Sequence, residues 1–273
     1  MPLKLIVAIA LILAWLYFLR LEKKRNSSHQ QEEIREAADR IFSDLGKTYS
    51  SFHEFVPALP TDFADRDLSF YDHMAQALCS ENFVLLGDVE DRTLSQTYPQ
   101  NRTFVRILVS NSGSVQAAIF DVTPKGFLRL SAWLFGMRHM KIVELQSELQ
   151  NGHFVVTTLA PCTPMEKPVQ IHVIHLSHRT TIRELISAHI EHLAKQTAAQ
   201  EGSKEQIQRT LNDVLASQGR QLQILHEFRK GVGFGLTEKE KEGFAKGSLS
   251  RQVTADVFSG IDELADKKKK IND

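Results

Sequence analysis

The chain has 273 residues, which is enough for one or two domains with a buried core. Lys and Arg together number 33, and so do Asp and Glu, so the net charge is zero. The basic excess typical of nucleic-acid-binding proteins is missing, and we expect no nucleic-acid partner. A hydrophobic content of 42% excludes disorder throughout, and two cysteines, Cys79 and Cys162, exclude a multi-bridge disulfide framework.

The N-terminal segment is the most informative part of the sequence. An uncharged apolar run extends from Leu5 to Leu19, with Lys4 before it and Arg20 after it. Because both basic side chains can reach the headgroups, a helix formed by this run can span a lipid bilayer. The run ends in WLYFL, without the small residues of a signal-peptide cleavage site, and no polar stripe marks it as a core helix. The sequence therefore predicts an uncleaved single-pass anchor.

Charge bias predicts the orientation of this anchor. Basic residues crowd its C-terminal flank, at Arg20, Lys23, Lys24 and Arg25, against Lys4 and the terminal amine on the other side. The positive-inside rule then places the large C-terminal part in the cytoplasm. We expect residues 1–25 to form a membrane anchor with a basic flank, which makes the lipid bilayer the first partner of the chain.

Residues 26–68 are expected to form a juxtamembrane helix and a connector. Apolar residues recur at helical spacing over residues 32–45, and Gly46 is the predicted stop. Residues 48–67 contain Pro57 and Pro60 and predict an irregular connector. Ser69 followed by Asp72 is typical of a helix start, so a short helix is predicted over residues 70–80.

The middle of the chain is rich in β-forming runs, which cover residues 83–89, 104–109, 115–122, 142–149, 153–159 and 169–176. Turn-forming residues at 111–114 and at Asn151-Gly152 predict two hairpins, and residues 128–135 predict another strand or a short helix. We therefore expect an α+β fold, with an antiparallel, meander-like sheet of about five or six strands flanked by helices.

The C-terminal part is predicted to be helical. One apolar stripe predicts a helix over residues 180–196, and a second amphipathic stretch over residues 207–225 is expected to break at Gly219. Thr237 with Glu240 predicts a capped helix, and residues 250–265 predict another. We expect residues 69–200 to form the α+β domain and to fold without the helical region of residues 201–273.

Histidines supply the candidate chemistry. Five of the eleven lie between His172 and His192, and imidazole is the commonest metal ligand. His178, His189 and Glu184 form a candidate metal-ligand set, although the HIEH segment at 189–192 lacks the spacing of a zinc protease helix. The alternative is that these histidines are ordinary surface and interface residues. No cofactor is expected.

Two functions follow from these features. The first is a membrane-anchored binding or interaction module with a protein partner, since no nucleophile or phosphate-binding motif is present. The second is a membrane-tethered hydrolase or metal-dependent enzyme that uses the region from His172 to His192. The sequence favours the first of these.

Overall fold

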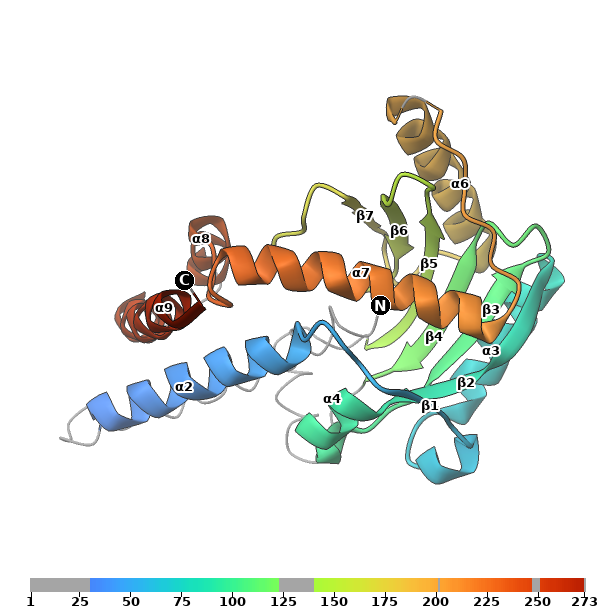
Figure 1. Ribbon diagram of the computed structural model, residues 1–273. Coiled ribbons are helices and arrows are strands. Elements are labelled where there is room, and N and C mark those ends of the chain that lie inside the picture. Colours follow the sequence, from blue (N-terminus) through green and yellow to red (C-terminus); the bar gives the residue numbers. More distant parts are fainter. Residues whose placement is uncertain (1–29, 123–139, 201, 247–250, 273) are drawn as a thin grey trace. The chain divides into compact units, whose positions relative to one another are not determined.

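The computed structural model describes residues 30–122, 140–200, 202–246 and 251–272 (Figure 1). The predicted anchor from Leu5 to Leu19 and the element expected at residues 128–135 lie outside this part of the chain. Within the part that is described, no helix combines the length and the apolar character that crossing a membrane requires.

The contacts divide the chain into two compact units, which we call the sheet unit and the helical unit. The described residues of the sheet unit lie within 52–162 and 167–221. Those of the helical unit lie within 30–51, 163–166 and 222–272. These limits differ from the expected ones, because the sheet unit begins before residue 69 and continues beyond residue 200.

The sheet unit contains a seven-stranded sheet whose spatial order follows the sequence order, so the predicted α+β fold is confirmed. All neighbouring strands are antiparallel except β6 and β7, which are parallel. The strands are β1 Phe55–Pro57, β2 Phe83–Asp91, β3 Val105–Ser110, β4 Gln116–Asp121, β5 Lys141–Glu148, β6 Phe154–Thr158 and β7 Ile171–His175.

The expected antiparallel pairing holds from β1 to β6 and does not hold for β7. A parallel neighbour requires a long connection that returns the chain to the end of the sheet where the previous strand began. Residues 159–170, with three prolines, form that connection between β6 and β7. The sequence predicts the strand at this place but carries no signal for its direction.

Both predicted hairpins are confirmed. Between β3 and β4, Ser110 N donates to Val115 O at 2.8 Å, and Gly113 has a φ of 80°. Between β5 and β6, Leu149 N donates to His153 O at 2.8 Å, and Gly152 has a φ of 82°. A positive φ is readily adopted by glycine and costs free energy for other residues.

Helices α3 and α6 cover one face of the sheet, which we call the α3/α6 face. The main core lies under them and includes Phe104, Leu108, Ile119, Leu145 and Leu185.

In the sheet unit the helices are η1 Pro60–Phe63, α3 Leu68–Ser80, α4 Arg92–Thr97, η2 Pro99–Asn101, α6 Ile182–Ala199 and the first half of α7 Leu211–Gly231. The connector expected at residues 48–67 thus contains β1 and η1.

The N-cap residue of α3 differs from the predicted one. Asp67, and not Ser69, is the N-cap: its carboxylate accepts from Phe70 N at 3.1 Å and from the Ser69 hydroxyl at 2.6 Å. A carboxylate satisfies the free N–H groups of a first turn as well as a serine does.

The helical unit contains α2 Gln30–Thr48, α8 Glu238–Lys246, α9 Arg251–Asn272 and the second half of α7. Gly46 does not end α2 and Gly219 does not break α7, so both expected stops are wrong. Helix α2 packs against α9, and Arg229 forms a fully buried ion pair with Glu240. The predicted cap of α8 is confirmed, since Glu240 N donates to Thr237 Oγ1 at 3.2 Å and Thr237 N to Glu240 Oε2 at 2.9 Å.

Candidate functional site

The edge of β2 is the candidate docking site of the sheet unit. Strand β1 pairs only with the last three residues of β2, Val89 to Asp91. One further hydrogen bond, from Ala58 N to Asp88 O at 2.9 Å, ends this contact. Among the strands of the described chain, none pairs with residues 83–87 on the β1 side, whereas β3 pairs with β2 on the other side. An unpaired edge presents backbone N–H and C=O groups for pairing with another strand.

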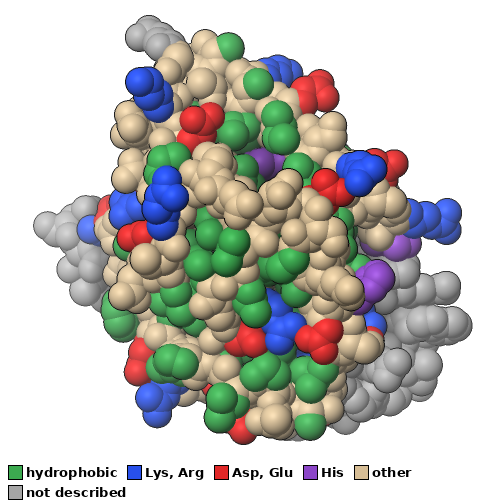
Figure 2. Space-filling model, turned by 90° about the vertical axis from the view of Figure 1, so that its right-hand side faces the viewer, with side chains coloured by type: hydrophobic (Ala, Val, Ile, Leu, Met, Phe, Trp, Pro, Cys, Tyr) green, Lys and Arg blue, Asp and Glu red, His purple; other side chains and the backbone are tan. Residues whose placement is uncertain are grey.

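The side chains along this edge are apolar and exposed. Val84 is 49% and Leu85 48% exposed, and because successive strand residues alternate, they lie on opposite faces of the sheet. Phe83 is buried in the core. Figure 2 views the side on which β2 and α3 lie in Figure 1, and hydrophobic side chains gather over the middle of this side. The edge thus offers both backbone groups and apolar contact.

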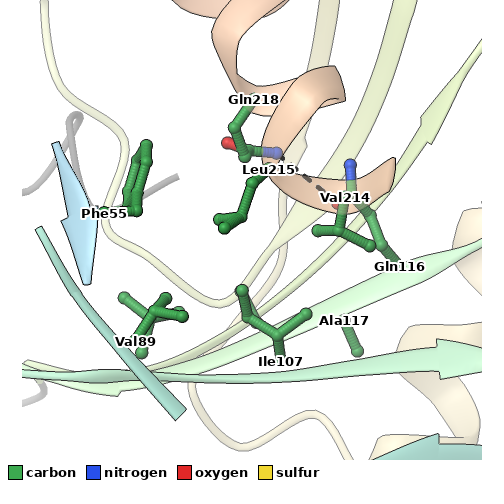
Figure 3. A pocket seen from close by; sticks show the side chains of 10 residues that line it. Phe55, Val89, Ile107, Gln116, Ala117, Val214, Leu215 and Gln218 are labelled. Atoms are coloured by element: carbon green, nitrogen blue, oxygen red, sulfur yellow. Dashed lines mark hydrogen bonds between the residues drawn. The ribbon is translucent and has the colours of Figure 1, made fainter. Parts of the chain in front are cut away.

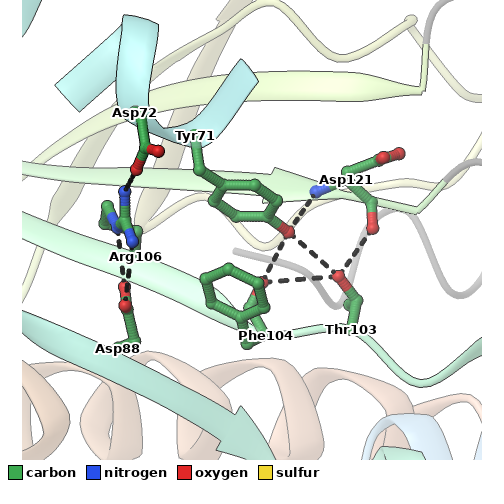
Figure 4. A network of polar contacts seen from close by, with 7 residues as sticks. All are labelled: Tyr71, Asp72, Asp88, Thr103, Phe104, Arg106 and Asp121. Carbon is green, nitrogen blue, oxygen red and sulfur yellow. Dashed lines mark hydrogen bonds and ion pairs between the residues drawn. The ribbon is translucent and has the colours of Figure 1, made fainter. Parts of the chain in front are cut away.

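Ion pairs bound the uncharged stretch at both ends. Glu81 pairs with Arg183 at 2.9 Å, and Asp88 accepts two hydrogen bonds from Arg106, at 2.9 and 3.1 Å. Arg106 Nη1 also donates to Asp72 of α3 at 2.6 Å (Figure 4). The hydrogen bonds that Arg106 donates to Asp88 raise the pKa of Arg106 above its usual value despite partial burial. The Arg106 pairs connect β2, β3 and α3, and the Glu81 pair connects the end of α3 to α6, so together they position the edge.

Tyr71 of α3 anchors the same region from the buried side. Its hydroxyl donates to Phe104 O at 3.0 Å, accepts from Asp121 N at 2.7 Å and lies 3.2 Å from Thr103 Oγ1 (Figure 4). The Tyr71 ring stacks on Phe104 with centroids 4.1 Å apart. Burial raises the pKa of Tyr71, so the hydroxyl stays protonated and acts as a structural group.

The opposite face of the sheet, which we call the α7 face, holds a small cavity (Figure 3). Val89, Ile107 and Gln116 of the sheet and Val214 and Gln218 of α7 contribute to its walls. Its volume is about 20 Å³, which accommodates one water molecule, whereas small-molecule sites are roughly 300–1,000 Å³. Gln218 donates to Gln116 Oε1 at 3.5 Å, and Gln116 Nε2 has no hydrogen-bond partner among the residues that the structure describes. This space suits a bound water and is too small for a substrate.

The predicted metal ligands have other roles in the structure. His178 is exposed in the turn before α6. Glu184 forms the capping box of that helix, where its carboxylate accepts from Thr181 N at 2.8 Å. His189 is buried, with one ring nitrogen 3.0 Å from Ser147 Oγ and the other 3.0 Å from Thr157 Oγ1. Across the described ranges, no three His, Cys, Asp or Glu side chains are grouped as ligands of one metal ion.

The structure brings together a histidine pair that the sequence interpretation missed. His153 Nδ1 lies 3.0 Å from His172 Nε2, and both rings are half-buried. Burial lowers the pKa of His172, and the neighbouring His153 lowers it further; burial and His172 lower the pKa of His192. The parallel register, which places Val155 beside His172, produces this contact, so only the direction of β7 could have predicted it.

The sequence signal at the open edge of β2 is ambiguous in kind: Val84, Leu85 and Leu86 are consecutive apolar residues. Such a run is typical of a strand covered on both faces, so the sequence does not predict that Val84 and Leu85 are exposed. No family model, curated protein or solved structure matches the chain in the three comparisons. Its function is therefore inferred from the geometry of this edge.

Proposed function

We propose that the protein is a membrane-anchored interaction module, and that the edge of β2 docks an extended segment of a protein partner. The observation that carries this proposal is the uncharged, apolar edge over residues 83–87, with which no strand of the described ranges pairs on the β1 side. In β-strand addition, main-chain hydrogen bonds supply affinity and alternating side chains supply specificity. Val84 and Leu85 would contact the partner on the two faces of the sheet.

The backbone N–H and C=O groups at the edge of β2 point in the direction that pairing with an added strand requires. Asn82 O accepts from Asn111 N, on the side of β3. Because backbone groups alternate in direction along a strand, those of Phe83 and Leu85 face away from β3. An added strand would form hydrogen bonds with these groups and would lie along the same edge of β2 with which β1 already pairs.

The anchor makes the module local to a membrane. In this proposal the run from Leu5 to Leu19 spans the bilayer once and the sheet unit lies on the cytoplasmic side. Tethering raises the effective concentration of the module for other membrane proteins. Carbonate extraction and protease protection of the full chain test this part: retention in the membrane and protection in intact cells support it, and release or external digestion contradicts it.

Site-specific photocrosslinking tests the docking edge. A photoreactive phenylalanine derivative replaces Val84 in the full chain, in native membranes. The matched control carries it at Ile190 of α6, which is 56% exposed and also apolar. We expect a discrete adduct from position 84 that Leu85→Lys abolishes, because a charge at a strand edge opposes pairing. No adduct at position 84, or equal adducts at both positions, overturns the proposal.

A metal-dependent enzyme or hydrolase in the region from His172 to His192 is the second candidate. The observation that favours it is the contact between His153 and His172, since imidazole nitrogens are common ligands of zinc. Calorimetric titration of the full chain with Zn²⁺ tests it. Stoichiometric binding that His172→Gln removes supports this function, and no binding contradicts it.

A further inference from the structure

We infer that the segment docked on β2 is β2 of a second copy of the same chain, in an antiparallel pair centred on Val84. This inference rests on the proposed function, since it uses the same edge and names its partner. Edge strands pair readily with identical strands, and a two-fold axis makes the contact self-complementary.

Symmetry limits the possible registers. A two-fold axis that joins two copies into one continuous sheet stands perpendicular to that sheet, so each face of one copy continues in the same face of the other. Directly opposed residues point to the same face, and strand residues alternate between faces. A residue must therefore oppose one that is an even number of positions away, and the axis passes beside a residue that opposes itself.

Two features of the chain leave Val84 as that residue. A pair centred on Leu85 would place Phe83 of the second copy opposite Asp88, because the β-bulge between Leu85 and Gly87 leaves Asp88 only two rungs beyond Leu85, and Asp88 O already accepts from Ala58 N. A pair centred on Phe83 would draw Asn82 into the ladder, but Asn82 has a left-handed φ of 66° and is not extended. In the register centred on Val84 the ladder covers residues 83–85, so Asn82 lies beyond its last hydrogen-bonded pair and Asp88 keeps its bond to Ala58.

The same register matches the hydrogen-bonding groups. Phe83 of one copy then opposes Leu85 of the other, and these are the residues whose backbone groups face away from β3. Each such pair exchanges both of its N–H···O bonds, and the axis repeats the pair on its other side. Val84 faces Val84 in the non-hydrogen-bonded position, where Cα atoms are about 4.5 Å apart.

Side-chain chemistry is compatible with this contact. The exposed Val84 side chains meet each other on the α7 face, and each Leu85 covers Phe83 of the other copy on the α3/α6 face. Residues 82–87 carry no charge, and the flanking Glu81 and Asp88 are neutralised by Arg183 and Arg106. A net charge of zero removes long-range repulsion between copies. The short ladder predicts a weak dimer that membrane tethering strengthens.

Disulfide trapping tests the inference. The full chain carries Cys79→Ser and Cys162→Ser, which remove the exposed native thiols, together with Val84→Cys. Mild oxidation in membranes should give a covalent dimer, because a disulfide joins Cα atoms 4.4–6.8 Å apart. Leu85→Cys should give little, because position 85 meets its own copy only diagonally, at about 7–8 Å. Ile190→Cys controls for random collision.

The outcomes separate this inference from the proposed function. A dimer from Val84→Cys that exceeds both controls and is lost with Leu85→Lys supports self-pairing. No dimer, or equal dimers from Val84→Cys and Ile190→Cys, overturns it; a photoadduct between position 84 and a different protein would then leave the docking function standing. Since Val84 is half exposed, its replacement should leave folding intact, which thermal unfolding of the Val84→Cys variant checks.

Discussion

His189 lies between two hydroxyl groups, Ser147 Oγ and Thr157 Oγ1, with a separate ring nitrogen directed at each. A neutral imidazole satisfies both contacts, because one nitrogen donates and the other accepts. Burial, together with the nearby His192, lowers the pKa of His189 to about 3. The folded chain therefore holds this residue neutral.

We predict that acidification destabilises the sheet unit through His189. The unfolded chain binds a proton near pH 6.5 and the folded chain only near pH 3, so stability falls as the pH is lowered between these values. From pH 7.5 to 5.5 the loss should be about 1.4 kcal/mol, measured by urea unfolding. His189→Gln should remove this increment. His178→Gln, at an exposed histidine, should retain it, and an equal effect of both variants would contradict the assignment.

At the residue scale, the sequence predicts contacts that depend on spacing along the chain and does not predict contacts between distant residues. The cap formed by Thr237 and Glu240 depends on spacing along the chain, and it was predicted correctly. The sequence offers His178, His189 and Glu184 as candidate metal ligands because imidazole is the commonest metal ligand. In the structure, His189 contacts Ser147 and Thr157, which are distant in sequence, and Glu184 contacts Thr181.

Among the elements, the two hairpins show how local and long-range constraints differ. Gly113 and Gly152 have nearly the same left-handed φ. A Cβ on Gly113 would lie 2.8 Å from both Gln208 O and Ile207 Cγ2, whereas one on Gly152 would have nothing within 4 Å. The first hairpin is therefore also a contact surface for the segment that precedes α7.

Alanine substitution at the two glycines should separate these effects. Gly152→Ala should cost about 1–2 kcal/mol, the penalty of a left-handed residue with a Cβ. Gly113→Ala should cost about 1–3 kcal/mol more, because the backbone of Gln208 must move. Urea unfolding of both variants measures the difference. Equal losses would show that the close approach at Gly113 carries no cost.

Elements with strong local patterns were predicted, and those fixed by distant contacts were not. Turn residues and β-rich runs gave the hairpins, and apolar stripes gave α6 and α7. Strand β1 has three residues, one of them Pro57, which is too little for any periodicity. Gly219 lies on an exposed side of α7, so the helix continues through it at a cost of about 1 kcal/mol.

At the scale of the molecule, residues 203–221 belong to the sheet unit. Gln206 N donates to Glu148 O at 2.7 Å, and Gln208 N donates to Gly113 O at 2.8 Å. Arg220 forms two hydrogen bonds with Glu148, and Gln221 donates to Gln146 Oε1 at 2.9 Å. These contacts cover the α7 face of the sheet, so the sheet unit includes residues beyond the boundary expected at residue 200.

We predict that a chain of residues 52–221 unfolds cooperatively and that one of residues 52–200 does not. The shorter chain exposes Val105 and Ile107 and loses the buried Val214, at about 1.5–3 kcal/mol for each buried side chain. That loss is comparable to the free energy of unfolding of a typical domain, which is roughly 5–15 kcal/mol. Thermal melting followed by far-ultraviolet circular dichroism compares the two chains. Val214→Asp within residues 52–221 is the matched control, because it disrupts the same contact without shortening the chain. If residues 52–200 melt as sharply as 52–221 and keep the β signal, the α7 face needs no cover and the boundary expected at residue 200 stands.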